Sequence, residues 1–159
     1  QQRETGQTMA ETFAPVVDWG TLRTLFALTI QFGLYSQQID FKNAFVQSSL
    51  PAPIYLELPP GGYRNNPDLQ GKVLKVSKSL YGDRRAPKLW FDHCRRILTS
   101  EKYGFSTNDH LDPCLFLRPD CAIVLYVDDA IIVARNKATV DSIISQLEKD
   151  NLDLTREGD

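Results

Sequence analysis

The chain has 159 residues, of which 42% are hydrophobic and 24% are charged, and its formal net charge is −2. This length is enough for one domain with a hydrophobic core, and no apolar run approaches the ~20 residues that a membrane-spanning helix needs. The three cysteines cannot all pair with one another and lack the paired spacing of zinc ligands, so we expect an intracellular, non-membrane protein with reduced thiols. The first residue is Gln1 rather than methionine, which indicates a piece of a longer polypeptide.

Positive charge is concentrated in one segment of the chain. Residues 72–96 contain eight lysine and arginine residues against two aspartates, so this segment carries +6 while the remainder sums to −8. Such a block is most often a solvated surface, but lysine and arginine are also the residues that contact nucleic-acid phosphates. The net charge argues mildly against nucleic-acid binding, and the charge distribution favours a local phosphate-binding surface.

Hydrophobic spacing predicts the order of helices and strands. Apolar residues at helical intervals predict helices at residues 21–32, 89–101 and 139–147, with Gly33 where the first helix would end. Alternating or β-branched runs predict strands, which lie at residues 34–41, 54–58, 73–76, 114–117, 122–127, 130–134 and 152–154. A short helical turn at residues 42–47 and a proline-rich connection through Pro51 and Pro53 complete the prediction.

When residues 42–85 are set aside as an insertion, the predicted order is strand, helix, strand, strand, helix, strand. This is the split βαβ order of a ferredoxin-like sheet with its helices on one face. We therefore predict an α+β fold without an internal domain boundary. That architecture supports many functions, so the function must be argued from the residues of a site.

Residues 122–134 hold two adjacent aspartates, Asp128 and Asp129, between two apolar arms that are predicted to be buried strands. One interpretation makes the pair the two-residue loop of a β-hairpin, although glycine is usual at the second position of such loops. The other makes them metal ligands, because adjacent carboxylates repel each other unless a cation lies beside them. Taken alone, the stretch favours both interpretations equally.

Asp40 favours the metal-binding interpretation. It ends a predicted strand that would lie beside the hairpin in a split βαβ sheet, where Asp40 would face Asp128. Three carboxylates at one end of a sheet are suited to two Mg²⁺ ions ~3.5–4 Å apart, the arrangement of two-metal phosphoryl transfer. Taken by itself, Asp40 would instead be an N-cap for the helical turn that follows.

Four motifs, in order along the chain, resemble those of the reverse transcriptases of copia-type long-terminal-repeat retrotransposons. Tyr126-Val127-Asp128-Asp129 resembles the tyrosine-x-Asp-Asp motif, and residues 38–45 resemble the first catalytic-aspartate motif. Residues 12–16 and 79–90 are similar to two further signatures of that family. The resemblance covers nearly the whole chain.

The resemblance implies roles for particular residues. Asp40, Asp128 and Asp129 would bind two Mg²⁺ ions, or Mn²⁺ as a substitute, together with the backbone carbonyl of Phe41. Phe45 would be a steric gate against ribose, although without the motif an ordinary core phenylalanine is the commoner interpretation. The other residues would contact substrates: the incoming nucleotide by Tyr81, Gly82 and Arg84, and the primer and template by Tyr126, Val127, Arg85 and Lys88.

The resemblance also implies a right-hand polymerase in which residues 1–159 form a single partial domain. The palm would comprise residues 34–41 and 86–159, and residues 42–85 would be a fingers-like insertion. The thumb and RNase H domain would lie outside the chain, in a polyprotein that also contains an integrase. Expected partners are an RNA or DNA template with its primer and deoxynucleotides, and the expected location is a cytoplasmic virus-like particle.

The chain departs from the family at Asp83, where a leucine is common. An acid beside the nucleotide site motivates an alternative hypothesis, a non-catalytic transposon remnant that folds and binds nucleic acid without polymerising. A different palm-type nucleotidyl transferase or cyclase would share the metal chemistry. It would not explain the motifs at residues 12–16 and 79–90.

Overall fold

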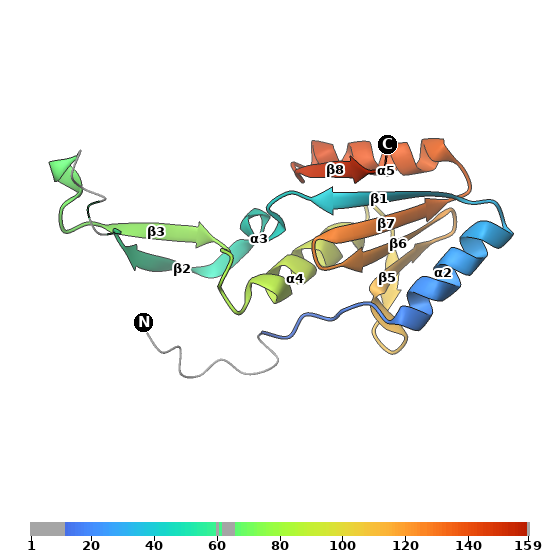
Figure 1. Cartoon of the computed structure of the whole chain (residues 1–159), viewed down its shortest axis with the longest axis horizontal. Coiled ribbons are helices and arrows are strands. Elements are labelled where there is room, and N and C mark those ends of the chain that lie inside the picture. The colour runs from blue at the N-terminus through green and yellow to red at the C-terminus, as the bar shows by residue number, and fades with distance from the viewer. Residues whose placement is uncertain (1–11, 60, 62–65, 159) are drawn as a thin grey trace.

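The computed structural model describes residues 12–59, 61 and 66–158 (Figure 1). Within these residues the helices are α2 (Trp19–Gln31), α3 (Ala44–Gln47), α4 (Ala86–Leu98) and α5 (Lys137–Lys149), with a 3₁₀ turn at Pro67–Leu69. The strands are β1 (Tyr35–Phe41), β2 (Ser49–Glu57), β3 (Val73–Lys78), β4 (Ser106–Asn108), β5 (Asp112–Arg118), β6 (Cys121–Tyr126), β7 (Asp129–Ala134) and β8 (Leu154–Glu157). The result is a mixed α/β fold built on antiparallel sheets.

A six-stranded sheet with the order β4-β5-β6-β7-β1-β8 forms the body of the molecule (Figure 1). β6 and β7 make a tight hairpin, and β1 pairs antiparallel with β7 on one side and β8 on the other. β1 therefore lies between the hairpin and the last strand, although it comes first in the sequence. This topology places the end of β1 beside the hairpin turn.

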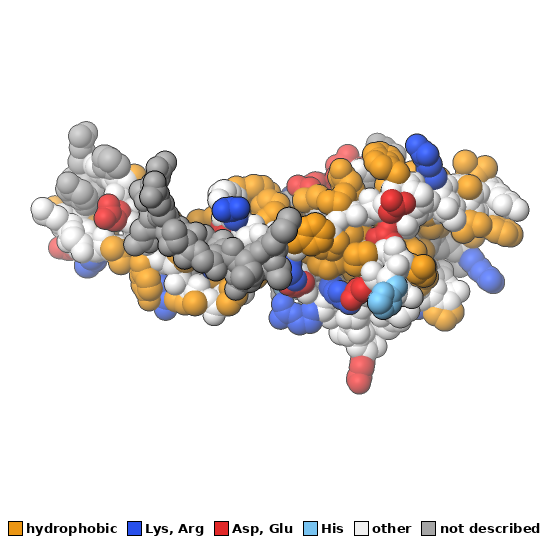
Figure 2. All heavy atoms as spheres, turned by 90° about the horizontal axis from the view of Figure 1, so that it is seen from below, with side chains coloured by type: hydrophobic (Ala, Val, Ile, Leu, Met, Phe, Trp, Pro, Cys, Tyr) orange, Lys and Arg blue, Asp and Glu red, His pale blue; other side chains and the backbone are white. Residues whose placement is uncertain are grey.

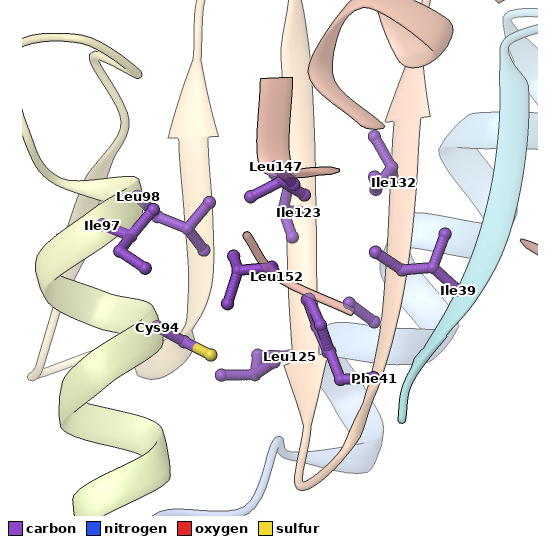
Figure 3. Close-up of a pocket in the computed structure, with 11 residues that line it drawn as sticks. Ile39, Phe41, Cys94, Ile97, Leu98, Ile123, Leu125, Ile132, Leu147 and Leu152 are labelled. Carbon is purple, nitrogen blue, oxygen red and sulfur yellow. The ribbon is translucent and has the colours of Figure 1, made fainter. Parts of the chain in front are cut away.

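One face of the sheet carries the main hydrophobic core, beneath α4 and α5 (Figure 3). Ile39, Ile123 and Ile132 are at most 2% exposed and pack with Leu98 of α4 and Leu147 of α5. The inward stripe predicted for the last helix is buried as its spacing indicates. The cavity inside this core is about 10 Å³, at the lower limit of the space that one water molecule needs. It is packed core and not a ligand site.

The other face of the sheet is partly covered by α2. Leu22 and Leu25 of this helix are buried, as are Val124 and Val133 of the hairpin, which alternate with the residues that face α4 and α5. Helices therefore cover both faces, whereas the split βαβ prediction placed them on one. α2 precedes the split βαβ unit in the sequence, so the predicted order of that unit did not indicate which face of the sheet α2 would cover.

β2 and β3 form a separate two-stranded sheet that projects from the body (Figure 1). β2 begins at Ser49 and contains Pro51 and Pro53, so the prediction of a connection here is wrong. The pairing shifts register between Ser49 and Ile54, and proline is tolerated in an edge strand at such an irregularity, because its missing N–H breaks no ladder bond.

The remaining predicted elements are present within one to three residues of their expected bounds, and β4 is an addition that the sequence did not indicate. Across the described residues, no helix combines the length and hydropathy that crossing a membrane requires. All three cysteines are buried, and burial raises the pKa of the Cys94 thiol well above its ordinary value.

Candidate active site

Asp40 and Asp129 lie directly opposite each other on β1 and β7. Asp129 also pairs with Tyr126 of β6, and Asp40 with Thr155 of β8, so these four residues form one row across the sheet. Directly paired residues of antiparallel strands project to the same face, here the face that α2 partly covers. From the next row on the same face, where Gln38 pairs with Ile131, Nε2 of Gln38 donates to Oδ1 of Asp129 at 3.3 Å. The split βαβ order predicted that β1 lies beside the hairpin, but Asp40 is in register with Asp129 rather than Asp128.

The hairpin turn consists of Val127 and Asp128, not of the two aspartates. Val127 has φ +55°, a left-handed conformation that is strained for a β-branched residue. Positive φ at the first of the two loop residues only is the pattern of a type II′ turn, in which glycine is usual. The indole N–H of Trp90 donates to the Val127 carbonyl at 2.7 Å, and the Phe41 N–H donates to the Asp128 carbonyl at 2.8 Å.

The interpretation of Asp40 as a helix cap is wrong. Asp40 is inside β1, and the N-cap of α3 is Asn43, which has φ +50° and makes no capping bond through its side chain. The carboxylate of Asp40 therefore has no structural task at the helix. It lies half-buried at the end of the sheet, as do Asp128 and Asp129.

The fit of these carboxylates to a cation site is partial. Asp40 and Asp129 share a face and a row, and Asp128 follows the strained turn residue. Among the residues that the structure describes, no three carboxylate, imidazole or thiol groups are gathered closely enough to hold a metal ion. The backbone thus brings two of the three candidate ligands into register, and the third, Asp128, lies in the adjoining turn.

Phe45 and Tyr81, for which the resemblance implies nucleotide contacts, lie against each other. Their ring centroids are 4.8 Å apart, with Tyr81 57% exposed and Phe45 partly buried against the core. Gly82 follows with φ +96°, in a turn closed by the bond from the Asp83 N–H to the Leu80 carbonyl at 3.1 Å. Glycine adopts this conformation without strain. The structure therefore brings Phe45, Tyr81 and Gly82 together.

Asp83 is neutralised within its own loop. The guanidinium of Arg85 donates to both of its carboxylate oxygens, at 3.1 and 3.0 Å, and the Arg85 N–H donates at 2.9 Å. Burial alone would raise the pKa of Asp83, but these hydrogen bonds outweigh it, and the pKa lies below its ordinary value. The acid that distinguishes this chain from the family is thus ionised and paired, so it presents little free negative charge to a nucleotide.

Some basic residues of the 72–96 segment form ion pairs with aspartates, and others are exposed. Arg85 is paired with Asp83, and Lys88 with Asp92 at 2.6 Å, one turn further along α4. Arg84 is exposed and forms no ion pair among the described residues. On the face shown in Figure 2, Lys and Arg side chains occur at intervals along the molecule, interleaved with hydrophobic ones.

The start of α2 and the hairpin enclose a hollow of about 170 Å³ beside the carboxylate row. Trp19 of α2 lines it together with Tyr126 and Asp129, and the two aromatic side chains are 70% and 46% exposed. No motif in the sequence marked Trp19 as part of a site. What marks Trp19 as a candidate is the unusual exposure of its side chain, which is visible only in the structure.

Known protein families include one that matches this chain over nearly its whole length. The chain matches the family described as reverse transcriptase (RNA-dependent DNA polymerase) over residues 1–158. The chain belongs to the reverse transcriptase family. The resemblance found in the sequence is thereby confirmed.

Curated relatives of this reverse transcriptase chain are transposon polyproteins. It is 31% identical over 156 residues to the retrovirus-related Pol polyprotein from transposon TNT 1-94 of Nicotiana tabacum, an alignment that covers 93% of this chain and 11% of the relative. It is 30% identical over 159 residues to the Pol polyprotein from transposon RE2 of Arabidopsis thaliana, covering 94% of this chain and 10% of the relative. The chain therefore spans about a tenth of the length of these relatives. No solved structure matches it with statistical significance.

Proposed function

We propose that the chain is the fingers–palm core of an RNA-directed DNA polymerase that adds deoxynucleotides to the 3′ end of a primer. The observation that carries the proposal is the direct pairing of Asp40 with Asp129, beside a turn that contains Asp128. Carboxylate oxygens are ligands that Mg²⁺ prefers. Membership of the reverse transcriptase family supports a role of these carboxylates in metal binding.

In the proposed mechanism Asp40, Asp128 and Asp129, with the carbonyl of Phe41, would hold two Mg²⁺ or Mn²⁺ ions. Such ions, when bound, activate the attacking 3′-hydroxyl and neutralise the triphosphate and the leaving pyrophosphate. The contribution of the chain is to fix the ligands. The β1–β7 ladder holds Asp40 and Asp129 at a constant separation, and positioning is the main protein contribution to phosphoryl transfer.

The nucleotide site in this proposal lies on the Phe45–Tyr81 pair. Phe45 would exclude a ribose 2′-hydroxyl, Tyr81 and Gly82 would lie under the incoming nucleotide, and the exposed Arg84 would contact its triphosphate. The contact between the two rings supports a shared surface. Tyr126 and Val127 would contact the primer end. Contacts of Arg85 and Lys88 with the template backbone would require exchange of their present aspartate partners.

The fold supports a palm assignment. In the order β6-β7-β1-β8, strands β1 and β6 run parallel with β7 between them, and this order supports the proposed split βαβ plan of a ferredoxin-like palm. We assign residues 34–41 and 86–159 to the palm and residues 42–85, with the projecting β2–β3 sheet, to the fingers. The right-hand arrangement would be completed by a thumb and an RNase H domain elsewhere in the polyprotein.

The proposed partners follow from this polymerase function. They are an RNA or DNA template with its primer, deoxynucleotides, and the remainder of a Pol polyprotein including an integrase. The relatives are themselves named as Pol polyproteins. A cytoplasmic virus-like particle is the corresponding proposed location.

The test is Asp128→Asn in a purified polypeptide that contains this chain within its Pol reading frame. Primer extension with Mg²⁺ should fall by at least ~100-fold, because a ligand charge is lost at nearly constant volume. Template–primer binding should change little. Asp109→Asn is the matched control, since Asp109 is an exposed aspartate paired with Arg95 on the surface. Undiminished extension by Asp128→Asn would contradict the proposal.

The alternative is a non-catalytic remnant, which is motivated by the partial length of the chain and by Asp83 beside the proposed nucleotide site. The pairing of Asp83 with Arg85 weakens the second of these arguments. A direct comparison of wild-type and Asp128→Asn polypeptides on RNA and DNA templates separates the two. Equal, background-level extension with intact template binding would favour the remnant.

A further inference from the structure

Trp90 of α4 connects the helix layer to the hairpin turn. Its side chain is fully buried, and its indole N–H is a donor that needs a partner when buried. That partner is the carbonyl of Val127, at 2.7 Å. A core tryptophan therefore directs its one polar group at the turn that carries Asp128.

The turn needs such a restraint. Val127 has φ +55°, and a β-branched residue in the left-handed region persists only where the surrounding structure holds it there. Two hydrogen bonds from outside the hairpin do so: the Trp90 N–H to Val127 and the Phe41 N–H to the Asp128 carbonyl at 2.8 Å. Each of the two turn residues thus has its carbonyl oxygen fixed by a donor from another element.

The ring of Trp90 also contacts the end of β1. Its centroid lies 5.1 Å from that of Phe41, in an edge-to-face arrangement typical of favourable aromatic pairs. Phe41 follows Asp40 directly in β1. One side chain therefore contacts both segments that carry the candidate ligands.

We propose that Trp90 is a positioning residue that holds the Val127–Asp128 turn in its strained form and so keeps Asp128 beside the Asp40–Asp129 pair. The inference rests on the proposed polymerase function for its catalytic consequence. Its structural part stands on this chain alone. If Trp90 only filled the core, its ring would be enough and the loss of its N–H would leave the turn unchanged. A variant that keeps the ring and lacks the N–H therefore tests the proposal.

The decisive variant replaces Trp90 by benzothienylalanine, which keeps the bicyclic ring and substitutes sulfur for the N–H. In this chain, hydrogen exchange of the Phe41 amide should accelerate about fivefold, because the turn that accepts its bond is released. Amides of β7 such as those of Ile132 and Val133 should be unchanged. The control is Val140→Ala, which removes core packing on α5 outside the cavity that Phe41 lines and should lower the thermal midpoint without a selective effect on Phe41.

The second measurement is steady-state kinetics in the Pol polypeptide. The benzothienylalanine variant should lose at least about tenfold in kcat, with KM for deoxynucleotides changed less than about threefold, because a misplaced ligand affects turnover more than substrate binding. Unchanged Phe41 exchange, or accelerated exchange with unchanged kcat, would overturn the proposal. If the wild-type polypeptide shows no extension that depends on Asp128, the polymerase function itself fails, and Phe41 exchange still decides whether Trp90 holds the turn.

Discussion

Asp40 and Asp129 are a directly paired couple of like charges across the β1–β7 ladder, and the hydrogen bond from Gln38 reaches only Asp129. Like charges at directly opposed positions of an antiparallel pair destabilise a sheet. In the proposed function, a cation bound beside these carboxylates would offset their repulsion. This gives the first prediction.

Asp40→Asn should stabilise the chain when divalent cations are removed with a chelator. The expected gain is about 0.2–1 kcal/mol, the usual size of a cross-strand pair effect. The same variant should gain less from added Mg²⁺ than the wild type, because it has lost a ligand. Thermal unfolding with chelator and across an Mg²⁺ series measures both effects, and a lower midpoint for Asp40→Asn in chelator would contradict the prediction.

Phe45→Ala should relax the discrimination against ribonucleotides. In the proposed function Phe45 excludes the ribose 2′-hydroxyl, and removal of its ring would open space beside Tyr81. We expect the ratio of kcat/KM for deoxynucleotides over ribonucleotides to fall by at least about tenfold, since loss of a steric clash is typically worth more than ~1.4 kcal/mol. Single-nucleotide incorporation assays measure it. Phe116→Ala, at a fully buried phenylalanine of β5, controls for loss of packing and should leave the ratio unchanged.

Trp19→Ala should weaken the binding of primer–template. Trp19 is an exposed aromatic side chain that lines a hollow with Tyr126 and Asp129, and stacking of a base on such a ring is worth about 1–3 kcal/mol. Phe32→Ala is the matched control, because Phe32 is also exposed but lies at the opposite end of α2. Equal affinities of the two variants in a fluorescence-anisotropy titration would exclude a specific role for Trp19.

The chain should lose stability in acid as the pH falls below about 4. Hydrogen bonds from Lys137 and Arg156 lower the pKa of Asp141 below its ordinary 3.8, and the bond from Arg118 does the same for Asp120. Groups with a lowered folded-state pKa stabilise the fold above the unfolded pKa, and this contribution is lost as the pH falls through the folded value. Urea unfolding between pH 5.5 and 2.5 measures it, and Asp141→Asn should make the dependence shallower.

The sequence predicted the parts of the molecule that follow local rules. The helical stripe of α5 and the apolar arms of β6 and β7 have the spacing of their elements, so their burial follows from the sequence. The proximity of Asp40 to the hairpin followed from the split βαβ order. These are cases where periodicity, turn chemistry and topology agree.

The sequence failed where tertiary contacts override local preference. Valine is among the residues least suited to a left-handed turn position, so no local rule assigns the turn to Val127 and Asp128. The hydrogen bond that holds Val127 in this conformation is donated by Trp90, which lies 37 positions earlier in the chain. Pro51 and Pro53 led to the wrong prediction of a connection for a similar reason, because a register shift in β2 accommodates both prolines in the strand.

The position of β1 in the sheet has a consequence for synthesis of the chain. β1 is complete at Phe41, but both of its neighbours, β7 and β8, lie more than 85 residues later. At a translation rate of about 5–20 residues per second, its two edges stay unpaired for roughly 5 to 20 s after they emerge. An unpaired strand is a template for association with another chain. The same connectivity that unites Asp40 with Asp129 therefore exposes the nascent polypeptide to aggregation, and chaperone dependence during translation is its expected cost.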